Sequence, residues 1–357
     1  MRIENQEPVV DKRAISSREC GRGVDAWTLR GAGGMVAEVL NYGAVVSRLL
    51  VPDRDGNLGD VTLGFSDPDQ WMDDNGSFFG ATAGRIAGRV PGGLLRFDGK
   101  EIQLERNEGE NHLHGGVQGL DKRLWRAEPM AEDGGTVGLK LRYDSPDGEE
   151  GYPGRVEFLV TYKLTPENEF IFEWEAYADR ATPVSLAHHS YFNLGGESSA
   201  LDHEITIFAD EIVTTDERMT PLGEVKSVNG TAADLREPKR LGAIVDDLWQ
   251  QHGDLYRLPE GGESELVARM TDAASGRTMD VRTTDDFLQF YTAAHFDGTV
   301  VGRDGLRYPK HAGICFECQG YPDSAAGLGD ILVRPGEPRR SRTVYAFGIE
   351  RKGGGDE

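Results

Sequence analysis

The sequence has few cysteines and no long apolar run. Only three of its 357 residues are cysteines, namely Cys20, Cys315 and Cys318. Such an odd, sparse set does not build a disulfide framework and suits a reducing compartment. No run of about 18 apolar residues occurs, so we expect no transmembrane helix. The opening MRIENQEP lacks the apolar core of a secretory signal. These absences favour a cytoplasmic protein with no membrane partner.

Basic residues are scarce beside acidic ones. Lysine and arginine number 39, aspartate and glutamate number 61, and the net charge is −22. A surface of this charge repels phosphate backbones and anionic lipids, so nucleic acid is a poor partner. Hydrophobic residues make up 38% of the chain, which is enough for a core and excludes a disordered protein.

Helical patterns are rare, whereas short strand patterns recur along the chain. Apolar and polar residues alternate in the manner of half-buried strands over residues 36–40, 45–51, 137–143, 156–164 and 170–177. Turn pairs occur between such runs at Asp55-Gly56, Asp98-Gly99, Asp133-Gly134 and Asn229-Gly230. We therefore predict an all-β fold, a large antiparallel β-sandwich with one or two short helices.

The clearest helical pattern covers residues 239–251. Its apolar residues repeat at three- and four-residue spacing, at Leu241, Ile244, Val245 and Leu248. This pattern predicts one short surface helix. No proline- or serine-rich linker and no fixed-period repeat divides the chain, so we expect a single domain over residues 1–350. Residues 351–357 are expected to form a flexible tail.

Motifs for common cofactors are missing, and histidines are the first candidates for a metal site. No phosphate-binding loop occurs, and no glycine-rich turn follows a strand and opens a helix. The histidines pair as His112 with His114 and His188 with His189. On a strand, residues 112 and 114 share a face, so both can ligate zinc. Each pair lacks a carboxylate or cysteine at ligand spacing, however, so we expect neither a metal nor a cofactor.

Two other segments contain candidate polar residues. In a strand, Cys315 and Cys318 point to opposite faces, which excludes a joint redox or zinc site. Glu317 shares its face with Cys315 and Gln319 and lies in an apolar run, so it either forms a salt bridge in the sheet or lines a pocket that tunes its pKa. Arg85 and Arg89 lie in a glycine-rich segment, where each either binds substrate oxygens or has a structural role.

Several motifs, in this order along nearly the whole chain, resemble the aldose 1-epimerase (galactose mutarotase) family. They are NYGAVVSRL at 41–49, GDVTLGF at 59–65, FGATAGRIAGR at 79–89, NHLHGG at 111–116, SPDGEEGYPG at 145–154, HSYFNL at 189–194, QFYT at 289–292 and GICFECQGYPDS at 313–324. Each motif alone is weak evidence, but the ordered set is strong. The resemblance implies a β-sandwich enzyme that opens and closes the ring of a free aldose such as glucose or galactose without a metal or redox cofactor.

The resemblance also implies roles for individual residues. His189 matches the general acid and Glu317 matches the general base. The remaining matches are sugar contacts, at Arg89, His114, Tyr191 through its backbone, Asp254 and Gln289. Asp254 matches when residues are counted from the predicted helix, whereas counting back from Tyr256 places the match on Gly253.

This chain departs from the family pattern at three places that leave the acid and the base intact. His188 and Gly88 stand where the family usually has asparagine, and Ala293-Ala294 stand where Gly-Asn is usual. These departures leave the preferred sugar open, and both a monomer and a homodimer remain possible.

Three other functions fit the sequence less well than an epimerase. A glycoside hydrolase needs two carboxylates at one bond, whereas the resemblance supplies a carboxylate and a histidine. A non-catalytic sugar-binding protein can lose the acid or the base, and both are present here. A sugar-phosphate epimerase needs a cluster of basic residues near the pocket, and the sequence offers none.

Overall fold

The computed structural model describes residues 9–15, 23–73, 75–196, 198–259, 265–322 and 328–350. Most of its regular structure is antiparallel β-sheet, as the sequence predicts. The described helices are short: α1 (Pro68–Asp73), α2 (Leu241–Ile244) and the 3₁₀ turns η1 (Pro91–Gly93), η2 (Leu120–Lys122), η3 (Glu149–Gly151), η4 (Trp249–Gln251) and η5 (Arg303–Gly305). No helix in these ranges has the length and apolarity needed to cross a membrane.

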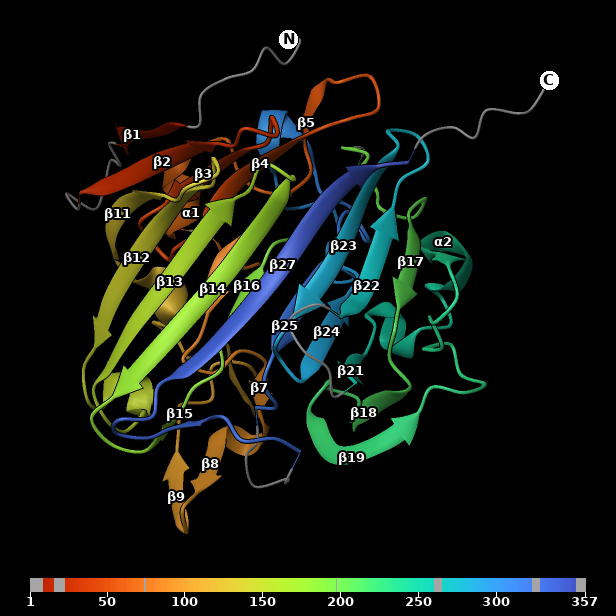
Figure 1. Cartoon of the computed structure of the whole chain (residues 1–357). Coiled ribbons are helices and arrows are strands. Elements are labelled where there is room, and N and C mark those ends of the chain that lie inside the picture. Colours follow the sequence, from red (N-terminus) through yellow and green to blue (C-terminus); the bar gives the residue numbers. More distant parts are fainter. Residues whose placement is uncertain are drawn as a thin grey trace.

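A broad nine-stranded sheet forms one layer of the molecule (Figure 1). Its strands, in spatial order, are β11 (Arg126–Ala131), β12 (Val137–Ser145), β13 (Val156–Leu164), β14 (Glu169–Ala178), β27 (Arg339–Ile349), β23 (Arg277–Thr283), β22 (Leu266–Thr271), β17 (Glu204–Ile207) and β20 (Lys239–Arg240). The late strand β27 pairs with β14 on one side and β23 on the other. It thereby joins strands from both halves of the sequence in one sheet.

Two five-stranded sheets accompany the broad sheet. The first is an N-terminal meander of β1 (Val9–Ile15), β2 (Val24–Arg30), β3 (Val36–Leu40), β4 (Val46–Pro52) and β5 (Leu58–Asp60). The second contains β19 (Pro221–Ser227), β18 (Glu211–Thr215), β21 (Leu255–Arg257), β24 (Phe287–Tyr291) and β25 (Cys315–Gln319), in that spatial order. In Figure 1, β24 and β25 lie behind the broad sheet.

Four strand pairs complete the described sheets. They are β6 (Ala81–Ala83) with β16 (Ala187–His189), β7 (Arg89–Val90) with β10 (His112–Leu113), β8 (Leu94–Phe97) with β9 (Lys100–Gln103), and β15 (Thr182–Pro183) with β26 (Leu332–Val333). The β16 strand also contacts β25. Through this contact the β6–β16 pair lies beside the second five-stranded sheet.

Alternating side chains along the strands build the core. In β13, for example, Val156, Phe158, Val160, Tyr162 and Leu164 are all buried. Burying each such side chain contributes roughly 1.5–3 kcal/mol to folding. Between β13 and the short strands lies a box of aromatic rings around His188. The strand patterns predicted at 36–40 and 156–164 match β3 and β13 in full.

The helix predicted over residues 239–251 is wrong in its extent. Lys239 and Arg240 pair with β17 instead, and the α-helix covers only Leu241–Ile244. A 3₁₀ turn follows at Trp249–Gln251. The apolar residues 241, 245 and 248 are nevertheless buried, as the pattern predicted. Sheet pairing thus replaces the predicted helix at residues 239–240, and turns replace it after Ile244, while the three apolar residues stay buried. The predicted tail, residues 351–357, lies outside the described residues.

Candidate active site

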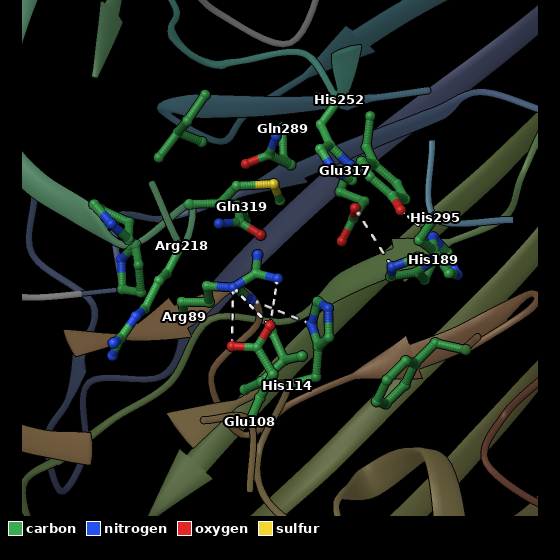
Figure 2. Close-up of a pocket in the computed structure, with 18 of the residues that line it drawn as sticks. Arg89, Glu108, His114, His189, Arg218, His252, Gln289, His295, Glu317 and Gln319 are labelled. Atoms are coloured by element: carbon green, nitrogen blue, oxygen red, sulfur yellow. Dashed lines mark hydrogen bonds and ion pairs between the residues drawn. The ribbon is translucent and has the colours of Figure 1, made fainter. Parts of the chain in front are cut away.

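A cavity of about 440 Å³ opens beside β24 and β25. Its size is typical of small-molecule sites. The structure brings all of the predicted site residues except Asp254 to its wall, namely Arg89, His114, His189, Tyr191, Gln289 and Glu317. Figure 2 shows several of them around the cavity. They come from five separate strands or turns, so the fold assembles the site from distant parts of the chain.

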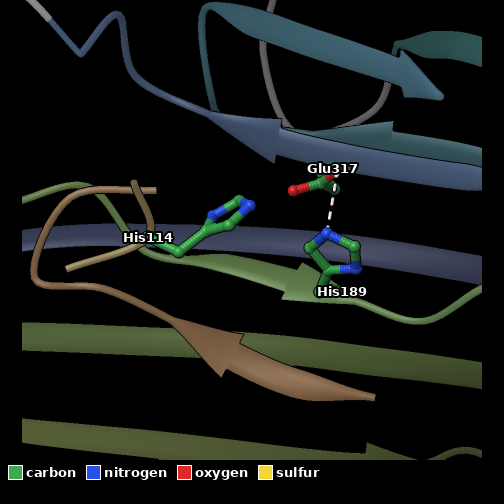
Figure 3. A group of neighbouring side chains, drawn as sticks. All are labelled: His114, His189 and Glu317. Carbon is green, nitrogen blue, oxygen red and sulfur yellow. Dashed lines mark ion pairs between the residues drawn. The ribbon is translucent and has the colours of Figure 1, made fainter. Parts of the chain in front are cut away.

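Glu317 and His189 face each other in this cavity (Figure 3). His189 Nε2 lies 3.5 Å from Glu317 Oε1, and the two side chains are only 5% and 4% exposed. Glu317 is the central residue of β25 and lies opposite Gln289 of β24. Of the two alternatives left open by the sequence, Glu317 therefore lines a pocket. Its single described ion partner is the imidazole of His189.

Burial shifts the pKa values of both partners toward their neutral forms. It raises the pKa of Glu317 to about 8, against the opposing effect of the Arg89 charge. It lowers the pKa of His189 to about 4. At neutral pH the resting pair is therefore a carboxylic acid and a neutral imidazole. Besides the N–H proton of the neutral imidazole, the pair holds one further proton, which either the carboxyl group or the imidazole can carry.

Cys315 lies behind the imidazole, on the same face of β25 as Glu317. Its Sγ is 3.8 Å from His189 Nδ1. Burial raises the pKa of this thiol well above its usual range, so it stays protonated. With the protonated Glu317 carboxyl facing Nε2, the proton of the neutral ring is on Nδ1, where it points toward the Cys315 sulfur, a weak acceptor, and Nε2 is free to accept a proton from Glu317. Cys318 is on the opposite face, as the strand alternation predicted.

His114 presents a hydrogen-bond donor to the cavity. It follows β10 with a φ of +48°, and its Nδ1 accepts a hydrogen bond of 3.2 Å from the Gly88 amide. Burial lowers the pKa of His114 well below its usual range, so the ring is neutral. Because Nδ1 is an acceptor, the proton of the neutral ring is on Nε2. This N–H is suited to a sugar oxygen.

Three of these side chains could in principle hold a metal ion. Ligand atoms of His114, His189 and Glu317 lie within 4.8 Å of one another. A metal on His114 Nε2 would move that ring's proton to Nδ1, against the Gly88 amide that donates there. The hydrogen bond therefore favours a ring that donates to substrate over a ring that binds metal. The sequence interpretation had not brought these three residues together as a ligand set.

His112 is not part of the cavity, contrary to the idea that it shares a face with His114. Its two ring nitrogens lie 2.7 Å from the Glu105 carbonyl oxygen and 2.7 Å from the Tyr152 hydroxyl. The positive φ of His114 ends the strand after Leu113, so the alternation that relates positions 112 and 114 does not continue. His112 is a buried structural residue.

The two arginines of the glycine-rich segment also separate. Arg89 lines the cavity and forms a two-pronged ion pair with Glu108, with Nη2 2.8 Å from Oε1 and Nε 3.1 Å from Oε2. Arg85 is 2% exposed and donates instead to Ser145 Oγ, at 2.7 and 3.0 Å, and to carbonyls of the same loop. Arg89 is thus a site residue, whereas Arg85 has the structural role.

Asp254 lies outside the cavity. Its neighbour Leu255 pairs with Gln289 and lines the cavity, so Asp254 points to the other face of the sheet. There it borders a separate hollow beside Trp249, and burial raises its pKa to about 6. The sugar contact predicted for Asp254 is therefore not supported by its position. His252, which lines the cavity, enters from the same segment.

Sequence reasoning missed several cavity residues. His252 and His295 each line the cavity and stack with Tyr291, at ring-centroid distances of 5.5 and 5.7 Å. Gln319 lines the cavity two residues after Glu317. Strand alternation already placed Gln319 on the face of Glu317, and this signal was available from the sequence. Glu108 gave no such signal, because its pairing with Arg89 exists only in the folded chain.

Known proteins resemble this chain over most of its length. A sequence model of the family described as aldose 1-epimerase matches residues 25–346. Human galactose mutarotase is 41% identical over 317 residues, which cover 87% of this chain and 91% of the human protein. Aldose 1-epimerase of Escherichia coli (strain K12) is 33% identical over 331 residues, 90% of this chain and 94% of that protein. The crystal structure of galactose 1-epimerase from Lactobacillus acidophilus NCFM superposes with a TM-score of 0.85 at 28% identity, covering 96% of this chain and all of that one.

Proposed function

The chain belongs to the aldose 1-epimerase family, and from this premise we propose how its cavity interconverts the α and β anomers of a free aldose. The proposal depends on one observation: Glu317 and His189 face each other at 3.5 Å in a buried, sugar-sized cavity. Galactose and glucose are the proposed substrates, since the human relative is named for galactose.

The reaction needs one base and one acid. Glu317 takes the proton of the C1 hydroxyl while His189 gives a proton to the ring oxygen, and the bond between C1 and the ring oxygen breaks. The open aldehyde turns about the C1–C2 bond and closes on its other face, with both proton transfers reversed. Each acid or base of this kind contributes about 10²–10⁴-fold. Together they lower the barrier by roughly 5–11 kcal/mol if they act independently.

The resting protonation state fits these roles after one proton shift. In the empty cavity the proton is on Glu317, because burial disfavours both ions. Sugar hydroxyls that donate to the carboxylate stabilise its anion, which favours transfer of the proton to His189 Nε2 across the 3.5 Å gap. The carboxylate is then the base and the imidazolium the acid. His114, Arg89, Gln289 and the backbone at Tyr191 are proposed to hold the remaining hydroxyls.

Polarimetry of freshly dissolved sugars tests the proposal. We expect the protein to accelerate the mutarotation of α-D-galactose and α-D-glucose, and a pentose run in parallel measures how far the cavity discriminates. No acceleration with any of these sugars would contradict the proposal. Release of reducing sugar from a glycoside would instead favour a hydrolase. A hydrolase needs a second carboxylate at the same bond as Glu317, and one of the cavity's other carboxylates, Glu108, is held by Arg89.

The pH profile is expected to be bell-shaped, because the pair must hold one proton. Above about pH 8 Glu317 loses this proton and no acid remains. Below about pH 4 His189 gains a second proton and no base remains. We therefore expect kcat/KM to be nearly constant between these limits and to fall about tenfold per pH unit beyond each. Stopped-flow polarimetry with the uncatalysed rate subtracted measures the profile. A single transition near pH 6.5 would contradict the pairing and indicate an isolated histidine.

Substituting the two arginines should separate binding from stability. Arg89→Met is expected to raise KM roughly 10- to 100-fold, the worth of a hydrogen bond from a charged group, with little change in the free energy of unfolding. Arg85→Met should instead lower the free energy of unfolding by about 3 kcal/mol or more, because several buried acceptors lose their donor. Urea unfolding and saturation kinetics on both variants measure the two effects. Equal effects of both substitutions on KM would contradict these assignments.

Other features of the protein remain proposals. We propose a single domain over residues 1–350, because β27 pairs with strands from both halves of the chain. We also propose a cytoplasmic location, based on the sparse cysteines. A monomer and a homodimer are both compatible with the proposed site, and sedimentation equilibrium distinguishes them. A sugar phosphate is a poor substrate, because the two arginines of the cavity wall, Arg89 and Arg218, are matched by Glu108 and Glu217 and leave no excess positive charge for a phosphate.

A further inference from the structure

Gln319 is a buried amide that the proposed acid–base chemistry does not use. It follows Glu317 by two residues on β25, so both side chains point to the cavity face of the strand. Gln319 is only 2% exposed, and its Oε1 is buried without a hydrogen-bond partner. Its amide has no hydrogen bond with the described part of the chain. Leaving such a group unpaired in a protein interior is costly, so structures rarely do it without a reason.

Gly88 provides the space for this amide. It has a φ of +79°, and a Cβ at this position would lie 2.9 Å from Gln319 Nε2, closer than real Cβ atoms approach. The absence of a side chain at position 88 therefore lets the amide extend to the Gly88 backbone. The Gly88 amide also holds His114. One glycine thus borders two polar side chains of the cavity wall.

The position of Gln319 along the strand indicates which part of a ligand it meets. Residues two apart on a strand are separated by about 7 Å, roughly the width of a sugar ring. A sugar whose C1 lies at Glu317 thus extends its distant hydroxyls toward Gln319. In Figure 2 the Gln319 amide lies above the Arg89 guanidinium and to the left of Glu317. A hydroxyl both donates and accepts, so it can satisfy either end of this amide.

We propose that Gln319 binds a sugar hydroxyl remote from the anomeric carbon and, with Gly88, determines which aldoses the cavity accepts. This inference rests on the proposed assignment of the cavity as the sugar site. The amide is a binding group with no part in proton transfer. It contacts the substrate in the ground state and in the transition state alike, so its loss should change KM and leave kcat nearly unchanged.

Steady-state kinetics of Gln319→Leu on galactose and its monodeoxy analogues tests the inference. For galactose we expect KM to rise roughly 3- to 10-fold, the worth of one neutral hydrogen bond, with kcat within about twofold. For the deoxy sugar that lacks the contacted hydroxyl, wild type and variant should have the same KM. Gln118→Leu, at an exposed position, is the matched control and should change neither constant.

A second variant tests the role of Gly88. Gly88→Ala adds the Cβ that displaces the Gln319 amide, so it should lose discrimination at the same hydroxyl. Its unfolding curve shows how much strain the positive φ adds.

An unchanged KM for galactose in Gln319→Leu would overturn the inference, and so would an equal KM ratio for every analogue, which indicates a purely structural role. Glu317→Gln in the same assay distinguishes a failure of the proposed sugar site from a failure of the role proposed for Gln319. If Glu317→Gln abolishes turnover while Gln319→Leu leaves KM unchanged, the proposed sugar site is supported and the role proposed for Gln319 is wrong. If it retains turnover, the proposed site itself is wrong.

Discussion

Replacing Glu317 with glutamine is expected to lower kcat for mutarotation by about 10²–10⁴-fold. The amide keeps the size of the carboxyl group but cannot take the C1 hydroxyl proton. It also cannot pass a proton to His189, 3.5 Å away. Initial rates on fresh α-D-galactose, followed by polarimetry, measure the loss, and KM should change far less than kcat because the cavity keeps its shape.

Asp254→Asn is the matched control for this experiment. It makes the same acid-to-amide change at a partly buried carboxyl that lies outside the cavity and also has a raised pKa. We expect its kcat and KM to stay within about twofold of wild type. A loss in Asp254→Asn as large as that in Glu317→Gln would mean that the sugar site extends to the other face of β21. Near wild-type rates for Glu317→Gln would refute the proposed base.

Replacing His189 with asparagine should cost a similar factor, about 10²–10⁴-fold in kcat, because no acid then protonates the ring oxygen. The substitution should also remove the alkaline limb of the pH profile. That limb reports the last proton held by the pair, and the amide side chain cannot share this proton. Rates measured from pH 5 to pH 9 give both quantities in one series.

The neighbouring His188 offers a matched control on the same strand. Alternation along β16 turns its ring into the core, where it packs between Tyr162, Phe170 and Phe172 at ring distances of 5.5–5.7 Å. His188→Asn, which installs the usual family residue, should lower the melting temperature and leave the shape of the pH profile unchanged. If His188→Asn and His189→Asn lost kcat equally, a general packing defect would explain both, and the acid role of His189 would lose its support.

The burial of both partners explains how the site works without a permanent charge pair. An ion pair inside an apolar wall costs desolvation energy that a neutral pair avoids. The resting neutral form therefore keeps the proton on Glu317 without the desolvation cost of an ion pair. The polar substrate then supplies the hydrogen bonds that stabilise the charged form. Arg89 favours the same outcome, since its charge lowers the pKa of Glu317. The ion pair between Arg89 and Glu108 partly neutralises the Arg89 charge and so limits its effect on the pKa of Glu317.

The family departures noted in the sequence fall at three different kinds of position. His188 fills a place in the core, where ring packing decides its effect. Gly88 lies at the cavity wall, where the missing side chain makes room for Gln319. Ala293 has a φ of +55°, a conformation that glycine adopts at less cost, in a turn beside Tyr291. Of the three positions, Gly88 is the one that lines the cavity, so we expect it to affect substrate preference most.

The sequence by itself determined the fold class and the family, and it predicted His189 and Glu317 as the acid–base pair. Alternation at β13 gave the strand and its buried face, and alternation at residues 315–319 placed Glu317 on one face with Cys315 and Gln319. These patterns succeed because a strand repeats every two residues whatever lies around it. The ordered motifs identified His189, and the geometry places it opposite Glu317 as the proposed chemistry requires.

Tertiary structure alone decided which polar residues share the cavity. Arg85 and Arg89 are four residues apart with similar sequence neighbours. Arg85 nevertheless donates hydrogen bonds to the loop that begins at Ser145, whereas Arg89 forms an ion pair with Glu108 at the cavity. Asp254 matched a family position by counting, but the pairing of Leu255 with Gln289 turned it to the other face. Sequence position fixes the face of a side chain only while a strand continues. Where strands end, as at His114, the partner that a side chain meets depends on contacts between segments far apart in the chain.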